Sequence, residues 1–69
     1  MFNKRKFEAA LKERGITMTE MAKYLSISTV TLYRKLNGVS DFTYTEINLC
    51  RKLFGKELAE AIFFGDKVA

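Results

Sequence analysis

Four side chains in the stretch SISTVTLYRKLNG, residues 26–38, carry groups suited to contact another molecule. They are the methyl pair of Val30, the phenol of Tyr33, the guanidinium of Arg34 and the amide of Asn37. Their spacing of i, i+3, i+4 and i+7 places them on one face of a helix. Leu32 and Leu36 lie on roughly the opposite side. We expect the leucine side to pack in the core, so the mixed face, made of Val30, Tyr33, Arg34 and Asn37, stays exposed and can contact a partner.

The chemistry of this face suits double-stranded DNA. An arginine can form paired hydrogen bonds to O6 and N7 of guanine, and an apolar side chain can pack on the methyl group of thymine. We therefore predict that Arg34 and Val30 contact bases, and that Tyr33 stacks or bonds to phosphate. The alternative for each residue is an ordinary solvated helix face.

The charge distribution also favours a polyanionic partner. The 69 residues have a net charge of +4. Residues 1–38 hold eight lysines and arginines against three acids, a net charge of +5, whereas residues 39–69 hold four against five, a net charge of −1. A basic half of this kind fits nucleic acid, although a solvated basic surface would have the same composition.

The elements that must position this face are helices. The chain has no proline, its four glycines fall where helical patterns end, and no alternating run of β-branched residues competes. Gly15 is expected as a left-handed cap. We expect a single all-α domain over residues 1–69, a compact bundle of five short helices, with a fraying tail at residues 65–69. The expected helices span about 3–14, 17–26, 29–36, 43–55 and 56–64.

Hydroxyl residues mark three helix starts. Thr17 with Glu20, and Thr43 with Glu46, have the spacing of capping boxes, in which side chain and backbone of the two residues bond reciprocally. Ser28 is the expected N-cap of the helix that carries the mixed face. These caps set the boundaries of the second, third and fourth helices.

Apolar stripes along these helices predict the core. The expected inward residues are Phe7, Ala10, Leu11, Ile16, Met21, Ala22, Leu25, Ile27, Leu32, Leu36, Ile47, Cys50, Leu53, Phe54, Leu58, Ala61 and Ile62, with Phe42 packed at the start of the fourth helix. Phe63 and Phe64 are consecutive and cannot both face the same core. The last helix is therefore a candidate contact for a second copy of the chain, unless either ring merely covers the edge of the domain.

Composition argues against several classes of protein. One cysteine and no histidine exclude an intramolecular disulfide and the common zinc spacings, so we expect no metal and no cofactor. Cys50 lies on an apolar line with no base to activate it, which indicates packing rather than catalysis. We expect no enzyme, no catalytic residue and no small-molecule substrate.

Location and extent follow from the ends of the chain. No signal peptide and no run of 18 apolar residues occur, so we expect a cytoplasmic protein of a bacterium or its phage, without a membrane partner. The initial methionine and the lack of a trailing linker favour a whole protein.

Residues 16–38, ITMTEMAKYLSISTVTLYRKLNG, resemble the helix-turn-helix of the lambda-like Cro and phage repressor family. The matching positions are Thr17, Ala22, Ile27 and the closing pair Asn37 and Gly38. The resemblance implies a DNA-binding domain with a helix-turn-helix at about residues 17–37 and a recognition helix, 29–36, in the major groove. It therefore implies a phage-type transcriptional regulator, such as a repressor.

The resemblance assigns roles residue by residue. It implies base contacts from Thr29, Val30, Tyr33 and Arg34, and phosphate contacts from Thr17, Ser28 and Asn37. Two departures occur: Met18 stands where the family usually has glutamine, and Leu11 and Leu36 replace a frequent ion pair between the first and third helices. Met18 removes a side-chain contact to phosphate, but backbone amides at the helix start remain.

We expect a homodimer on a pseudo-palindromic operator, because helix-turn-helix proteins commonly bind half-sites about 34–36 Å apart. The alternative is a protein-interaction module, such as an antitoxin or anti-repressor, that presents the same helix to a protein. Salt-sensitive DNA affinity distinguishes the two.

Overall fold

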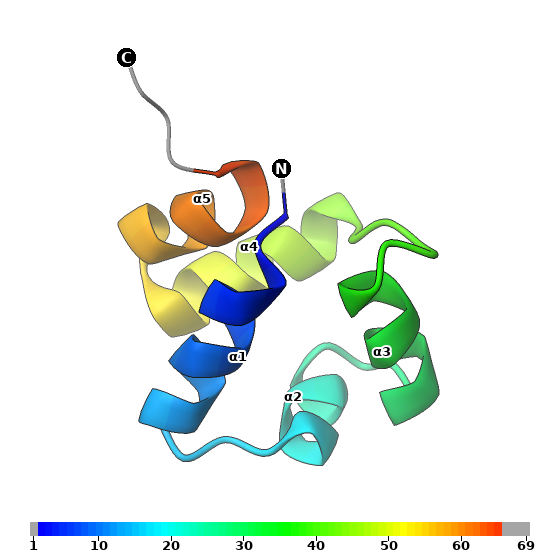
Figure 1. Cartoon of the computed structure of the whole chain (residues 1–69). Helices are drawn as coiled ribbons and strands as arrows, with labels where there is room; N and C mark the ends of the chain where they lie inside the picture. Colours follow the sequence, from blue (N-terminus) through cyan, green and yellow to red (C-terminus); the bar gives the residue numbers. More distant parts are fainter. Residues whose placement is uncertain (1, 66–69) are drawn as a thin grey trace.

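The computed structural model describes residues 2–65, and within this range the chain forms five helices and no strand (Figure 1). They are α1 (Lys4–Glu13), α2 (Met18–Tyr24), α3 (Thr29–Leu36), α4 (Tyr44–Phe54) and α5 (Lys56–Phe64). The predicted all-α bundle is confirmed, and every helix boundary lies within two residues of its expected position. The tail expected to fray lies, except for Gly65, outside the described residues.

The predicted helix caps are present. The hydroxyls of Thr17 and Thr43 each accept the amide of the glutamate three residues later at 3.1 Å, and the glutamate carboxylates accept the threonine amides at 3.0 and 2.9 Å. Gly15 follows α1 with φ +69°, as expected for a left-handed cap. These local bonds fix where α2 and α4 begin.

Every helix contributes to one cluster of buried apolar side chains. Its members are Phe7, Ala10, Leu11, Met21, Ala22, Leu25, Leu32, Leu36, Cys50, Phe54, Ala59, Ile62 and Phe63. Four residues that were expected in the core are only half-buried against it, namely Ile16, Ile27, Ile47 and Leu53. Burial of the predicted stripes of α1, α2 and α3 is confirmed.

The predicted inward face of α5 was partly wrong. Ile62 is fully buried as expected, but Ala59 and Phe63 accompany it, whereas Leu58 and Ala61 are only half-buried. The helix has apolar residues on more than one side, so periodicity could not select the face that packs on α1 and α4. The prediction that the two consecutive phenylalanines point in different directions is confirmed, because Phe64 is 45% exposed.

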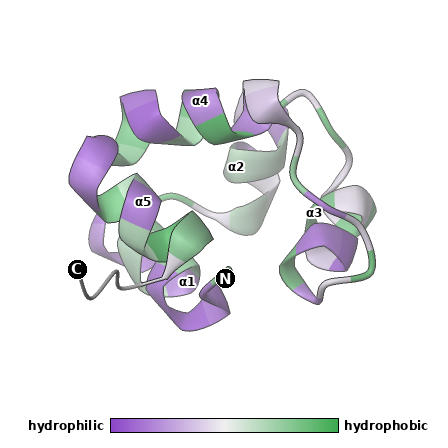
Figure 2. Cartoon of the chain, turned by 90° about the horizontal axis from the view of Figure 1, so that it is seen from above, coloured by the Kyte–Doolittle hydropathy of each residue, from purple (hydrophilic) through white to green (hydrophobic). Residues whose placement is uncertain are grey.

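The arrangement leaves α3 at one edge of the molecule (Figures 1 and 2). Helix α5 packs on α4 and α1, and α2 packs on α3. The amino-terminal end is fastened to α5, because the amide of Asn3 donates to the carbonyl of Ile62 at 2.6 Å. Phe2, Phe42 and Phe63 meet there with ring centroids 5.0–5.5 Å apart. The beginning of α1, the segment before α4 and the end of α5 are thus held together.

Candidate nucleic-acid interface

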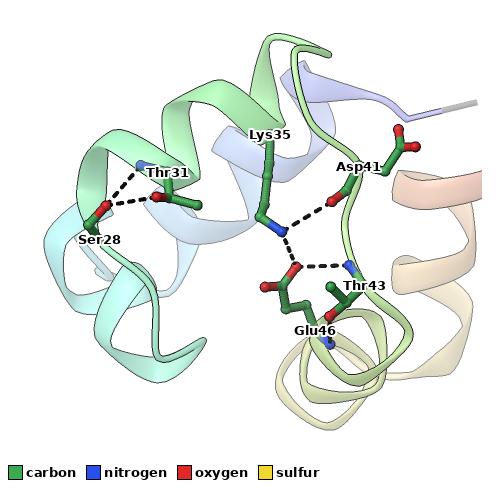
Figure 3. Close-up of polar contacts among 6 residues, drawn as sticks. All are labelled: Ser28, Thr31, Lys35, Asp41, Thr43 and Glu46. Atoms are coloured by element: carbon green, nitrogen blue, oxygen red, sulfur yellow. Dashed lines mark hydrogen bonds and ion pairs between the residues drawn. The ribbon is translucent and has the colours of Figure 1, made fainter.

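Helix α3 begins with a complete N-cap. The Oγ of Ser28 accepts the amide of Thr31 at 3.1 Å and its hydroxyl donates to Oγ1 of the same threonine at 2.9 Å (Figure 3). The predicted cap is therefore confirmed. The hydroxyl hydrogen is directed into the helix, so a bond from Ser28 to a phosphate requires the hydroxyl to rotate.

The two sides of α3 differ as the spacing predicts. Leu32 and Leu36 are buried at 0% and 3% exposure. The outer face of α3, defined here as Val30, Tyr33, Arg34 and Asn37, is exposed, with Val30 at 61% and Tyr33 at 44%. Thr29, the fourth residue predicted to contact bases, is half-buried in the first turn of this helix, whereas Asn37 was predicted to contact phosphate. The structure thus brings three of the four predicted base-contacting residues, Val30, Tyr33 and Arg34, together on one solvent-facing surface.

Helix α2 is connected to α3 by a turn with an unusual backbone. Ser26 has φ +61°, a left-handed conformation that costs an L-residue about 1–2 kcal/mol. The turn is closed by amide hydrogen bonds from Ser26 to the carbonyl of Lys23 and from Ile27 to that of Ala22, both at 3.0 Å. Tyr24 donates its hydroxyl to the carbonyl of Leu49 at 2.7 Å, which ties the end of α2 to α4. The helix-turn-helix is therefore anchored to the bundle from α2.

The two departures from the phage repressor pattern are accommodated by packing. Met18 is half-buried and packs against the core, so its side chain makes apolar contacts. Leu11 and Leu36 are both buried in the core cluster, at 2% and 3% exposure. Thr17, predicted to contact phosphate, is exposed at the start of α2 while its hydroxyl caps the helix.

A buried ion pair missed by sequence analysis fastens α3 to α4. The ammonium of Lys35 lies 2.8 Å from Oε1 of Glu46, and the two side chains are only 8% and 9% exposed. Lys35 also donates to the carbonyl of Asp41 at 3.1 Å, while the same glutamate oxygen accepts the amide of Thr43 (Figure 3). One carboxylate thus caps α4 and holds the end of α3. The capping-box spacing identified Glu46, but nothing in its spacing from Lys35 indicated a partner.

The environment of Glu46 favours its charged form. Burial alone raises the pKa of this carboxyl, but the hydrogen bonds and positive charge of Lys35, together with the amide of Thr43, outweigh it and lower the pKa below the ordinary 4.5. The ion pair is therefore intact at neutral pH.

Two of the basic residues counted toward a polyanion partner serve the fold instead. Lys35 forms the buried ion pair with Glu46. The guanidinium of Arg14 donates to the carbonyl of Ala10 at 3.1 Å and lies 5.2 Å from the ring centroid of Phe54. The basic residues of α1, α2 and α3 that are exposed are Lys4, Arg5, Lys12, Lys23 and Arg34. The positive surface is thus smaller than the sequence count suggests.

Asn37 has a partner that sequence analysis did not anticipate. The ammonium of Lys4, in the first turn of α1, donates to Oδ1 of Asn37 at 2.9 Å. Both residues are exposed, and Asn37 is the C-cap of α3. A cation from α1 therefore lies at the end of the outer face of α3.

The remaining reactive group is inert. Cys50 is fully buried, and burial, with a smaller contribution from Glu46, raises the pKa of its thiol to about 12. Among residues 2–65, no three His, Cys, Asp or Glu side chains are grouped to hold a metal ion. No helix in that range combines the length and apolar character needed to cross a bilayer.

The amino-terminal part of the chain matches a known protein family. Residues 1–37 match the family described as bacterial regulatory protein, Fis family. Because this match covers more than half of the chain, the protein belongs to that family of helix-turn-helix DNA-binding regulators. The matched segment ends at Asn37 and contains α1, α2 and α3, the helices that build and support the outer face. Comparisons with curated proteins and with solved structures gave no significant match.

Proposed function

We propose that this protein is a sequence-specific transcriptional regulator that binds double-stranded DNA through α3 as its recognition helix. In this proposal residues 1–69 act as a single domain, with the helix-turn-helix at about residues 17–37. Helix α3 enters the major groove while α2 crosses the phosphate backbone. The protein acts in the cytoplasm without a cofactor, and it is no enzyme.

The observation that carries the proposal is the outer face of α3. It combines an exposed guanidinium, phenol, amide and methyl pair on a helix whose opposite side is buried, which follows a hydrogen-bonded turn from α2, and whose last turn is fixed to α4. A rigidly held helix at the edge of the molecule can enter a groove about 12 Å wide without rearrangement of the bundle. Membership of a helix-turn-helix family supports the same assignment.

Within the proposal the residues divide into two groups. Arg34 bonds to guanine, Val30 packs on a thymine methyl, and Thr29 and Tyr33 contact neighbouring base edges. Thr17, Ser28 and Asn37 bind phosphates and set the register of the protein on the duplex. Specificity of the phage repressor type rests on the resemblance of residues 16–38 to that family.

We further propose that two copies bind a pseudo-palindromic operator. The exposed ring of Phe64 supports a contact through α5, because a large apolar side chain at 45% exposure gains from burial. Beside it lies an open groove of about 490 Å³ whose walls include Phe2, Phe42 and Phe63. A dimer would roughly double the limited surface that one module can bury on DNA.

Selection from a pool of randomised duplexes tests the proposal. The expected result is enrichment of a palindromic site whose log affinity falls linearly with log salt. Enrichment of a site without symmetry would contradict the dimer while preserving DNA recognition. Absence of binding even at about 50 mM salt would contradict the proposal, and the outer face of α3 would then be tested as a protein-binding surface.

A further inference from the structure

The first turn of α1 places a lysine at the end of the recognition helix. The amide of Asn3 is fixed to the carbonyl of Ile62 at 2.6 Å, and its side chain caps α1 by accepting the amide of Lys6 at 3.0 Å. Lys4 follows directly and reaches across to Asn37, 33 residues later, at 2.9 Å. Its backbone is therefore anchored, and its ammonium is held beside the outer face of α3.

The charge of this turn is unfavourable for α1 itself. The first turn contains Lys4, Arg5 and Lys6 and no acid, at the helix end where the dipole is positive. Helices α2, α4 and α5 each have a glutamate in the first turn instead. The cations at the start of α1 therefore oppose the usual electrostatic preference of a helix, which indicates a use other than stabilising α1.

The bond between Lys4 and Asn37 places two hydrogen-bond donor groups side by side. Because Oδ1 of Asn37 accepts from Lys4, the orientation of the carboxamide is set, and its Nδ2 amino group, which only donates, lies on the other side of it. An ammonium retains further hydrogens after one bond. Two adjacent donor groups with one positive charge match a phosphate oxygen, which only accepts.

We infer that Lys4 and Asn37 together bind one DNA backbone phosphate at the carboxyl end of α3, so that α1 contributes directly to the interface. This inference rests on the proposed DNA binding and extends it to a helix outside the helix-turn-helix. Lys4 contributes a positive charge, and the amino group of the Asn37 amide contributes a directional hydrogen bond. Their mutual hydrogen bond preorganises both groups before DNA arrives.

The test measures binding of the full chain to a fluorescent random-sequence duplex by anisotropy, between about 50 and 250 mM salt. Lys4→Met removes one phosphate contact, so the magnitude of the slope of log affinity against log salt falls by about 0.9. The ratio of wild-type to variant affinity is therefore about fourfold smaller at about 250 mM than at about 50 mM salt. Lys56→Met, an exposed lysine in α5, is the matched control and keeps the wild-type slope. Lys4→Arg retains the slope because it retains the charge.

A second variant separates binding from folding. Asn37→Asp keeps an acceptor for Lys4, so the fold is preserved, but it places a negative charge against the phosphate and lowers affinity about tenfold or more. A wild-type slope in Lys4→Met, whether or not its melting temperature falls, would mean that Lys4 only stabilises the end of α3 and would overturn the inference. Unchanged affinity in Asn37→Asp would overturn it too. Failure of the wild-type chain to bind would instead refute the proposed function itself.

Discussion

Replacing Lys35 by methionine should lower the free energy of unfolding, because it breaks the buried ion pair with Glu46. The variant keeps the length of the side chain but leaves the carboxylate of Glu46, only 9% exposed, without its cation. Breaking a buried pair from one side costs about 3–5 kcal/mol. The remaining hydrogen bond from the amide of Thr43 at 2.9 Å places this site at the lower end, about 3 kcal/mol. A chain of this length is stabilised by about 3–10 kcal/mol in total, so the loss is large.

A second substitution, Glu46→Gln, distinguishes this explanation from simple loss of packing by whether it raises or lowers the free energy of unfolding. In the wild type, Glu46→Gln leaves the buried ammonium of Lys35 without its anion and should cost about 3 kcal/mol, even though glutamine still completes the capping box. In the Lys35→Met background the same change removes an uncompensated buried charge and should stabilise the protein by about 1 kcal/mol. Urea unfolding followed by circular dichroism measures all four proteins, and Lys52→Met, an exposed lysine in α4, should stay within about 0.5 kcal/mol of wild type. Destabilisation by Glu46→Gln in both backgrounds would refute the reasoning.

Further predictions concern pH, the turn, the cap and the thiol. Because the folded pKa of Glu46 lies below its ordinary 4.5, the stability that this carboxylate contributes is present above pH 4.5 and is lost as the pH falls through the folded pKa. The urea midpoints of wild type and Glu46→Gln should therefore converge at low pH. A difference in midpoint that stays constant with pH would contradict this. Ser26→Gly should raise the free energy of unfolding by about 0.5–1 kcal/mol by relieving the positive φ, and a loss of stability would be inconsistent with strain there. Ser28→Ala should cost about 1 kcal/mol in unfolding and weaken binding to specific and random duplexes equally; a loss confined to the specific site would assign Ser28 to base reading. Cys50 should resist iodoacetamide at pH 8 in the native state and react in urea, whereas rapid native alkylation would show that the thiol is accessible.

The sequence predicted the fold well where local rules decide the structure. Capping boxes at Thr17 and Thr43 and the cap at Ser28 depend on residues three positions apart, so they could be read directly. The 3.6-residue period likewise identified the buried and exposed sides of α3. Helix α5 shows the limit of this method, because a helix with apolar residues on several sides has no single stripe.

The features that could not be predicted depend on contacts between distant residues. Lys35 pairs with a residue 11 positions away, and Lys4 with one 33 positions away, so neither follows from helical spacing. The positive φ of Ser26 follows from the need to join α2 to α3 in a short turn, and no glycine marks the position. The sequence placed the outer face of α3 correctly but could not indicate that Asn37 is supported from α1.

The central claim is that α3 reads DNA sequence through its outer face, and the specificity ratio of Arg34→Ala tests it most directly. Anisotropy titration at one fixed salt concentration measures the affinity of wild type and variant for the selected site and for a scrambled duplex. We predict that the variant loses about 1–3 kcal/mol on the selected site, about 5–150-fold, with a smaller loss on the scrambled duplex, and that its preference at one base pair is relaxed. Equal losses on both duplexes would contradict the claim, because Arg34 would then contact only the backbone.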